Sequence, residues 1–116
     1  MALIDVTGYN PINGWSRDYP LRLVFRFVGQ VEMTLPCVFS EGGDWGALAA
    51  AARGGGRCSA GGKGGDVVVA AGVVSFAAPR GGPRVAVCAA EAGDGLAKAA
   101  ALAAEWEAAV RRHGGG

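Results

Sequence analysis

Residues 21–37, LRLVFRFVGQVEMTLPC, decide the fold, because apolar side chains occupy alternate positions on both sides of Gly29. A period of two is typical of strands with one buried face. The apolar row consists of Leu21, Leu23, Phe25 and Phe27 before the glycine and Val31, Met33, Leu35 and Cys37 after it. The segment therefore predicts an antiparallel hairpin with one buried face and one solvent-exposed face. The solvent-exposed face carries Arg22, Arg26 and Glu32.

The length of the connection follows from the same alternation. A two-residue loop would place Phe27 opposite Glu32, because a shift of one residue turns a strand over. A three-residue loop at 28–30 instead pairs Phe27 with Val31 and Arg26 with Glu32. We therefore predict a connection of three or five residues in which Gly29 adopts a positive φ.

Two shorter elements flank this hairpin. The alternation in residues 2–7 predicts a strand at the edge of the sheet. Asp44 precedes an alanine-rich stretch and is a typical N-cap residue, so residues 45–53 predict a short helix that ends at a glycine. Trp45 and Leu48 lie three residues apart and are expected to anchor this helix in the core.

The second half of the chain predicts another hairpin and a long helix. Residues 66–78 are almost continuously apolar and predict a strand with Gly72 as a bulge, and residues 84–91 predict its partner. Asp94 is the expected N-cap of a helix that reaches residue 113. At 100° per residue, one helix face carries Leu96, Ala99, Leu102, Ala103, Trp106 and Val110, and the opposite face carries Lys98, Glu105 and Arg112.

The expected fold class is α+β, in one domain that spans residues 1–113. Strand, hairpin, helix, hairpin and helix follow one another, which predicts a two-layer sandwich with one antiparallel sheet of about five strands and the C-terminal helix packed on one face. The glycine-rich residues 54–65 predict a flexible loop, and residues 114–116 predict a disordered tail.

The composition predicts a thin core. The chain has 116 residues, of which 23 are alanine and only 26 are Leu, Ile, Val or Phe. A thin core gives a monomer of marginal stability, so self-association is as well supported as a monomer. The apolar faces of residues 66–90 outnumber the helices that can cover them, which makes this segment the expected homodimer interface.

Charge and cysteine content indicate the partners and the compartment. The net charge of +1 gives no argument for nucleic acid. No apolar run approaches the roughly 18 residues of a membrane span, and no signal peptide is evident, so we expect no membrane association. Three cysteines without metal-like spacing predict a reducing cytoplasm. Cys37 and Cys88 are expected to be buried, and Cys58 to be exposed in the glycine-rich loop.

No motif assigns a chemical reaction. A phosphate-binding loop at Gly62-Lys63 would need glycine at position 57 and Ser or Thr at 64, where the chain has Arg57 and Gly64. The single histidine, His113, lies at the end of the last helix, far from a predicted nucleophile. We therefore predict no catalytic residue, no metal and no cofactor. An acid pair formed by Asp18 and Glu41 stays open as an alternative.

Aromatic residues and an arginine form the candidate binding set. Its members are Tyr9, Trp15, Arg17, Tyr19 and Trp45. These residue types dominate binding hot spots, because they bring large contact area at low entropic cost. They predict a recognition surface for a protein or a small apolar ligand, and the alternative is that the rings cover the open end of the core.

Two functions follow from these patterns. The first is a small non-enzymatic binding or assembly module that acts on a protein partner or on itself, comparable in size to the inhibitor or immunity-type proteins of bacterial accessory genes. The alternative is a small-molecule-binding α+β protein with a pocket between helix and sheet, with weak enzymatic activity from carboxylates near the 9–19 loop.

Overall fold

A computed structural model describes residues 2–12, 14–39 and 41–113, with the backbone alone for residues 41 and 42. The tail predicted at residues 114–116 lies outside the described residues. The elements follow the order β1 (Leu3–Tyr9), β2 (Arg22–Phe27), β3 (Val31–Pro36), β4 (Glu41–Gly42), α1 (Trp45–Gly54), β5 (Cys58–Gly62), β6 (Gly65–Ala70), β7 (Val73–Ala77), β8 (Arg84–Cys88) and α2 (Ala89–Arg112).

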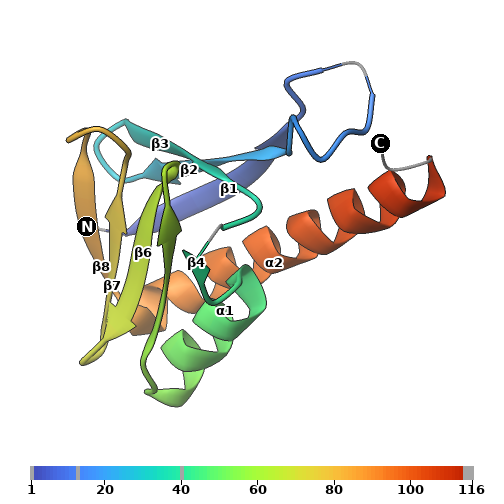
Figure 1. The fold of residues 1–116 in the computed structure, drawn as a ribbon. Coiled ribbons are helices and arrows are strands. Elements are labelled where there is room, and N and C mark those ends of the chain that lie inside the picture. Colours follow the sequence, from blue (N-terminus) through green and yellow to red (C-terminus); the bar gives the residue numbers. More distant parts are fainter. Residues whose placement is uncertain (1, 13, 40, 114–116) are drawn as a thin grey trace.

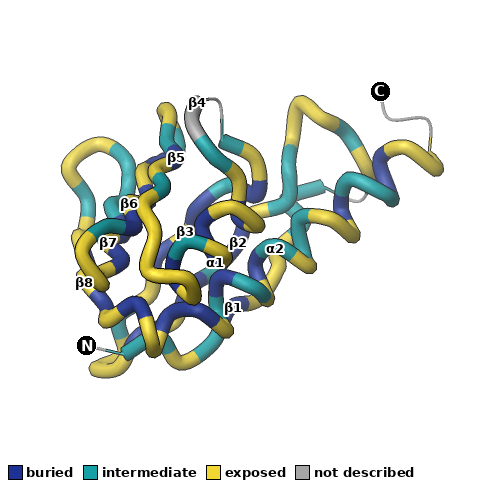
Figure 2. The backbone as a smooth tube through the Cα atoms, turned by 90° about the horizontal axis from the view of Figure 1, so that it is seen from below, coloured by how far each residue is buried: buried dark blue, intermediate teal, exposed yellow. Residues whose placement is uncertain are grey.

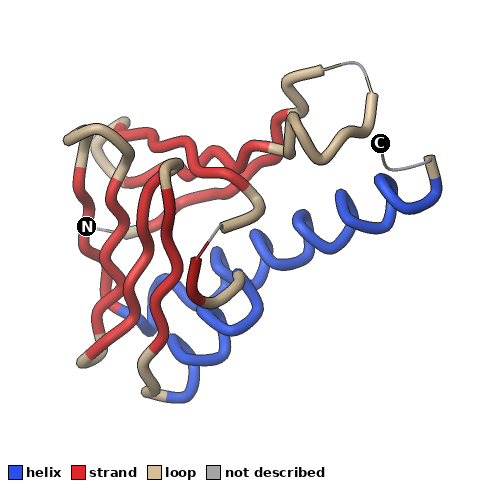
Figure 3. Tube along the Cα trace, viewed as in Figure 1, coloured by secondary structure: helices blue, strands red, loops and turns tan. Residues whose placement is uncertain are grey.

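The chain is α+β, but its strands form two antiparallel sheets rather than one. The order is β1-β2-β3 in one sheet and β4-β5-β6-β7-β8 in the other. The sheets face each other across the core, and both helices close the side that the sheets leave open (Figure 1, Figure 3). The prediction of a single five-stranded sheet is therefore wrong. Each hairpin pattern fixes its own local pairing but carries no information on which hairpins share hydrogen bonds.

The first hairpin has the predicted register. Phe27 pairs with Val31 and Arg26 with Glu32, so residues 28–30 form a three-residue connection. Gly29 has φ 87° there. The Arg26 Nε and the Glu32 Oε1 atoms lie 3.6 Å apart on the solvent-exposed face. Strand β1 pairs with β2 at the sheet edge, as predicted.

Residues 66–78 form two strands rather than one strand with a bulge. Ala70 pairs with Val73, which leaves Ala71 and Gly72 as a two-residue turn. Both turn residues have positive φ, 53° and 77°, which suits the right-handed twist of a tight hairpin. The predicted bulge at Gly72 is therefore the second residue of this turn.

The glycine-rich segment also contains a strand. Residues 58–62 pair with β6 as β5, so the flexible-loop prediction is wrong there. A strand needs only backbone N–H and C=O groups for its ladder, and Ala60 supplies one buried side chain. Gly61 makes room for the Asp66 carboxylate, which lies where a Cβ would be.

Both predicted helices are present, but α2 does not begin at the predicted residue. Asp44 caps α1 by accepting a 2.8 Å hydrogen bond from the Ala47 N–H. Helix α2 begins at Ala89, directly after β8, and not at the predicted cap Asp94. The Ala89 N–H donates to the Gly72 carbonyl at 2.9 Å, which ties the start of α2 to the β6–β7 turn.

The core joins both sheets to both helices. The Phe76 ring of β7 lies 5.4 Å from the ring of Phe25 and 5.2 Å from that of Phe27, both on β2. Trp45 of α1 packs against Phe25 on the same side. Along the strands, buried and exposed residues alternate (Figure 2). The predicted inner face of α2 is buried at Leu96, Ala99, Trp106 and Val110 and half-buried at Leu102 and Ala103.

The cysteines occupy three different environments. Cys37 is buried, as predicted, and Cys58 is half-buried on β5. Cys88 is exposed, so the prediction that it lies in the core is wrong. It follows the buried Val87 on β8 and therefore faces outward by alternation. Among the described helices, none combines the length and the apolar character that a bilayer crossing requires.

Candidate functional site

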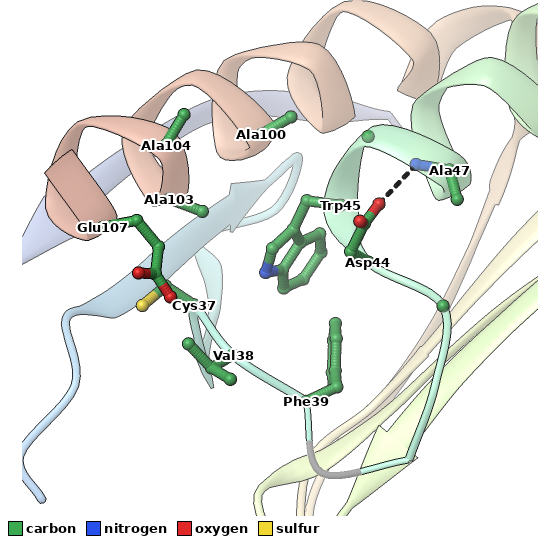
Figure 4. A pocket seen from close by; sticks show the side chains of 12 residues that line it. Cys37, Val38, Phe39, Asp44, Trp45, Ala47, Ala100, Ala103, Ala104 and Glu107 are labelled. Carbon is green, nitrogen blue, oxygen red and sulfur yellow. Dashed lines mark hydrogen bonds between the residues drawn. The ribbon is translucent and has the colours of Figure 1, made fainter. Parts of the chain in front are cut away.

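A pocket of about 580 Å³ lies where the segment after β3 meets both helices. Residues 37–39 and 43–44 form one side, the first turn of α1 forms the floor, and the middle of α2 forms the other side (Figure 4). The lining side chains include Val38, Phe39, Trp45, Ala103 and Glu107. The pocket thus lies beside the core, within the size range of small-molecule sites.

Small residues keep this pocket open. Ala100, Ala103 and Ala104 line it from α2, and their spacing of three and four residues places them on one helix face. Gly43 lines the opposite side. A Cβ on Gly43 would lie 2.7 Å from the Cys58 sulfur, so a larger residue there requires the Cys58 side chain to shift.

The indole of Trp45 places a hydrogen-bond donor in the pocket wall. Its ring is 1% exposed and is held between Phe39, at a centroid distance of 4.8 Å, and Phe25, at 5.2 Å. Its Nε1–H is buried and has no hydrogen-bond partner among the described residues. In Figure 4 this nitrogen points toward Cys37, Val38 and Glu107, three residues of the pocket lining.

An unpartnered buried donor is costly, because its lost hydration is not replaced. Trp106 on α2 has a second buried indole N–H without a partner among the described residues. Trp106 does not belong to the lining of this pocket. The two tryptophans therefore form a matched pair of buried donors, of which only Trp45 belongs to the pocket lining.

Two carboxylates lie at the pocket. Asp44 caps α1, and Glu107 extends the alanine face of α2 by one turn. Both Glu107 oxygens accept hydrogen bonds from Arg17, each at 3.0 Å. This bidentate contact lowers the pKa of Glu107 and raises that of Arg17. Glu107 is therefore ionised at neutral pH and connects the 10–21 loop to α2.

Cys37 is the thiol that lines the pocket. Burial raises its pKa to about 12, so the thiolate, which is the nucleophilic form, is scarce at neutral pH. His113 lies elsewhere, stacked on Trp15 with ring centroids 6.0 Å apart and an interplanar angle of 12°. The structure therefore does not bring the histidine to the cysteine of the pocket.

The five predicted binding residues do not form one cluster. Tyr9 and Tyr19 are 56% and 58% exposed, and Trp15 is 38% exposed. Trp45 belongs to the core and the pocket wall, whereas Arg17 reaches the pocket rim indirectly, through Glu107. The structure thus relates two of the five residues to one site.

Sequence reasoning missed Glu107 and Phe39. Phe39 was given no role in the sequence analysis, yet its ring packs on Trp45 at the pocket. Glu107 had a usable signal, because it continues the spacing of Ala100, Ala103 and Ala104 by three residues. A helix face of alanines that ends in a carboxylate indicates a space with one charged wall. The predicted acid pair Asp18 and Glu41 stays a prediction, since the Glu41 side chain is not described.

Other features do not indicate a metal or a known relative. Within residues 2–12, 14–39 and 41–113, no group of three His, Cys, Asp or Glu side chains could hold a metal ion. A second hollow, of about 510 Å³, lies on the outer face of the larger sheet, over Val68, Ser75 and Ala77.

Comparisons with protein families, curated proteins and solved structures gave no match.

Proposed function

We propose that this protein is a non-enzymatic binding protein that holds a small, mainly apolar molecule in the pocket between α1, α2 and residues 37–44. The observation that carries the proposal is the buried Trp45 N–H, which faces the pocket and has no partner among the described residues. A bound hydrogen-bond acceptor would remove the cost of this donor. Of the two functions predicted from the sequence, this is the binding of a small molecule, without the weak enzymatic activity.

The apolar part of the ligand would contact Val38, Phe39 and the alanines of α2. Val38 is 45% exposed, so its side chain can move aside as the acceptor approaches the indole nitrogen. Burial raises the pKa of the Cys37 thiol to about 12, so this pocket residue is a poor nucleophile at neutral pH. Binding rather than covalent chemistry is the use that these side chains favour.

The test follows the tryptophan indole N–H signals in ¹H–¹⁵N NMR spectra during titration with 4-methoxyphenethyl alcohol, 4-methoxyacetophenone and 4-propylanisole. We expect the Trp45 signal to shift with at least one probe, while the Trp106 signal stays in place. Trp45→Phe should weaken binding of that probe at least about fivefold, the loss of one hydrogen bond. The matched variant Trp106→Phe should leave its Kd unchanged.

Circular dichroism of both variants separates lost binding from lost folding. The proposal is overturned if none of the three ethers shifts the Trp45 signal at millimolar concentration. It is also overturned if Trp106→Phe weakens binding as much as Trp45→Phe does.

A second candidate function is self-association through the outer face of the larger sheet. Asp66 on β6, Ala77 on β7 and Arg84 on β8 lie side by side in one outward row. A twofold axis along β7 would place Asp66 of each copy against Arg84 of the other, an isologous contact of opposite charges. Val68 and Val73, each 41% exposed, give this face its apolar part.

The face is small, and three strands of five residues span only roughly 10 by 16 Å. Since stable interfaces bury about 800 Å² per partner, we propose a low-affinity homodimer. Sedimentation velocity from about 10 to 500 μM should show reversible dimers. Asp66→Arg should abolish them, and Asp66→Arg with Arg84→Asp should restore them.

Arg80→Asp, in an exposed turn outside this row, is the control and should leave the dimer intact. A protein that stays monomeric throughout this range overturns the dimer, as does a double variant that fails to recover it while folded.

A further inference from the structure

The charges at the pocket have one sign. Asp44, the N-cap of α1, and Glu107 of α2 both line it, and no basic side chain belongs to its described lining. Asp44 accepts one hydrogen bond, from the Ala47 N–H, with its Oδ1. A carboxylate has about four acceptor positions, so Asp44 keeps free positions for a ligand.

Glu107 also keeps acceptor capacity, although it is paired with a cation. Arg17 occupies one position on each oxygen, at 3.0 Å, and approaches from the 10–21 loop rather than from the pocket lining. Arg111 is the other cation that acts on Glu107 through its charge. The Arg17 side chain is 49% exposed, so solvent screens part of its charge.

A pair of acidic side chains alone does not define a site, but Trp45 adds an independent observation. Its unpartnered N–H, on a side chain that is 1% exposed, faces the same space. The pocket therefore presents a donor on its inner wall, apolar side chains around its middle, and carboxylates at α1 and α2. A complementary molecule combines a hydrogen-bond acceptor, an apolar body and a cationic group.

We infer that the ligand is an amphipathic amine, a small apolar cation whose ammonium group interacts with the pocket carboxylates of Asp44 and Glu107 while an oxygen elsewhere in the molecule accepts the Trp45 N–H. This inference rests on the proposed small-molecule function and names its ligand class. Charge-assisted hydrogen bonds to carboxylates are stronger than neutral ones. The amine should therefore gain most of its affinity over a neutral analogue from these two side chains.

Three probes with the same body test the charge. 4-Methoxyphenethylamine is cationic, 4-methoxyphenethyl alcohol is neutral, and 3-(4-methoxyphenyl)propionate is anionic. By isothermal titration calorimetry at pH 7 we expect the amine to bind about tenfold more tightly than the alcohol, and the propionate to bind most weakly. Higher salt should reduce the advantage of the amine.

Variants assign that advantage to the two carboxylates. Asp44→Asn keeps a good helix cap while it removes the charge, and Glu107→Gln keeps a group that can accept a hydrogen bond from Arg17. The double variant should bring the Kd of the amine to that of the alcohol. Glu105→Gln, on an exposed position of α2 outside the pocket lining, should keep the full advantage.

The outcomes separate this inference from the proposed function. If the alcohol and the amine bind equally while the Trp45 signal shifts, the amine assignment is wrong and the pocket stands. If Glu105→Gln removes the advantage as well, the effect is one of overall charge and the assignment is also wrong. If none of the three probes binds, the amine assignment is wrong, and the proposed function fails as well unless 4-methoxyacetophenone or 4-propylanisole shifts the Trp45 signal.

Discussion

Replacing Gly65 with alanine tests how closely the two sheets meet. Gly65 begins β6 with φ 119° and is buried. A Cβ there would lie 2.6 Å from the Ala77 carbonyl oxygen and 2.6 Å from a methyl group of Leu35. Leu35 belongs to β3 of the other sheet, so the added methyl group has to push the sheets apart or bend β7.

Two costs add in this variant. Because φ 119° lies outside the left-handed helical well, a side chain there costs about 1–3 kcal/mol, and an extra methyl group in a packed core costs about 1–3 kcal/mol. The expected loss is therefore about 2–6 kcal/mol of unfolding free energy, against the roughly 5–15 kcal/mol of a typical domain. The variant should be folded but much less stable, or unfolded at 25 °C.

Urea unfolding followed by circular dichroism measures this loss. Gly72→Ala is the matched control, because Gly72 also has positive φ, 77°, but its Cβ would meet nothing within 4 Å. It should lose only about 1–2 kcal/mol, the backbone cost alone. A Gly65→Ala variant no less stable than Gly72→Ala would refute the close approach of Leu35 to β6.

Thiol labelling of the native protein at pH 8 should modify the exposed Cys88 first and the half-buried Cys58 more slowly, while Cys37 stays protected until the protein unfolds. If Cys37 reacted as fast as Cys88, the result would contradict the burial of Cys37 and its pKa of about 12. Acid should weaken the contact between Arg17 and Glu107, whose folded-state pKa is lowered below the ordinary 4.5 by the Arg17 hydrogen bonds. The stabilisation that the ionised Glu107 gives the folded state is fully present above the unfolded-state pKa and is lost as pH falls through the folded-state pKa. The difference in Tm between the natural chain and the Glu107→Gln variant should therefore stay constant from pH 7 to pH 5 and shrink below pH 4.5. A difference that persists unchanged to pH 2 would contradict this role of Glu107.

The sequence predicted best where burial alternates with position. The register of the first hairpin followed from the parity of Phe27 and Val31, because a slip by one residue would have exposed a whole apolar row. Helix α1 was equally predictable, since Asp44, Trp45 and Leu48 have the residue types and spacing of a cap and two anchors.

The errors occurred where backbone geometry decides. The turn at Ala71 and Gly72 needs positive φ at an alanine, which is uncommon and gives no sequence signal. Strand β5 is held by its ladder with β6 rather than by side chains. Helix α2 starts six residues early, and its added first turns bury the small side chains of Ala89 and Ala92.

The candidate site was only partly predictable for a related reason. Trp45 and Arg17 were identified by residue type, whereas Glu107 became relevant only when the 10–21 loop reached α2. That contact joins residues 90 positions apart, and no local pattern in the chain encodes it.

The long C-terminal helix has a consequence for motion. Helix α2 has 24 residues, about 36 Å at 1.5 Å each, and its last turns extend past the sheets toward the 10–21 loop (Figure 1). Trp15 stacks on His113 and Arg17 binds Glu107, so the helix end and the loop hold each other. In hydrogen-exchange terms we expect them to form one cooperative opening unit, separate from the strands of the core. Because Glu107 also lines the pocket, a molecule bound there would slow exchange in the loop without touching it.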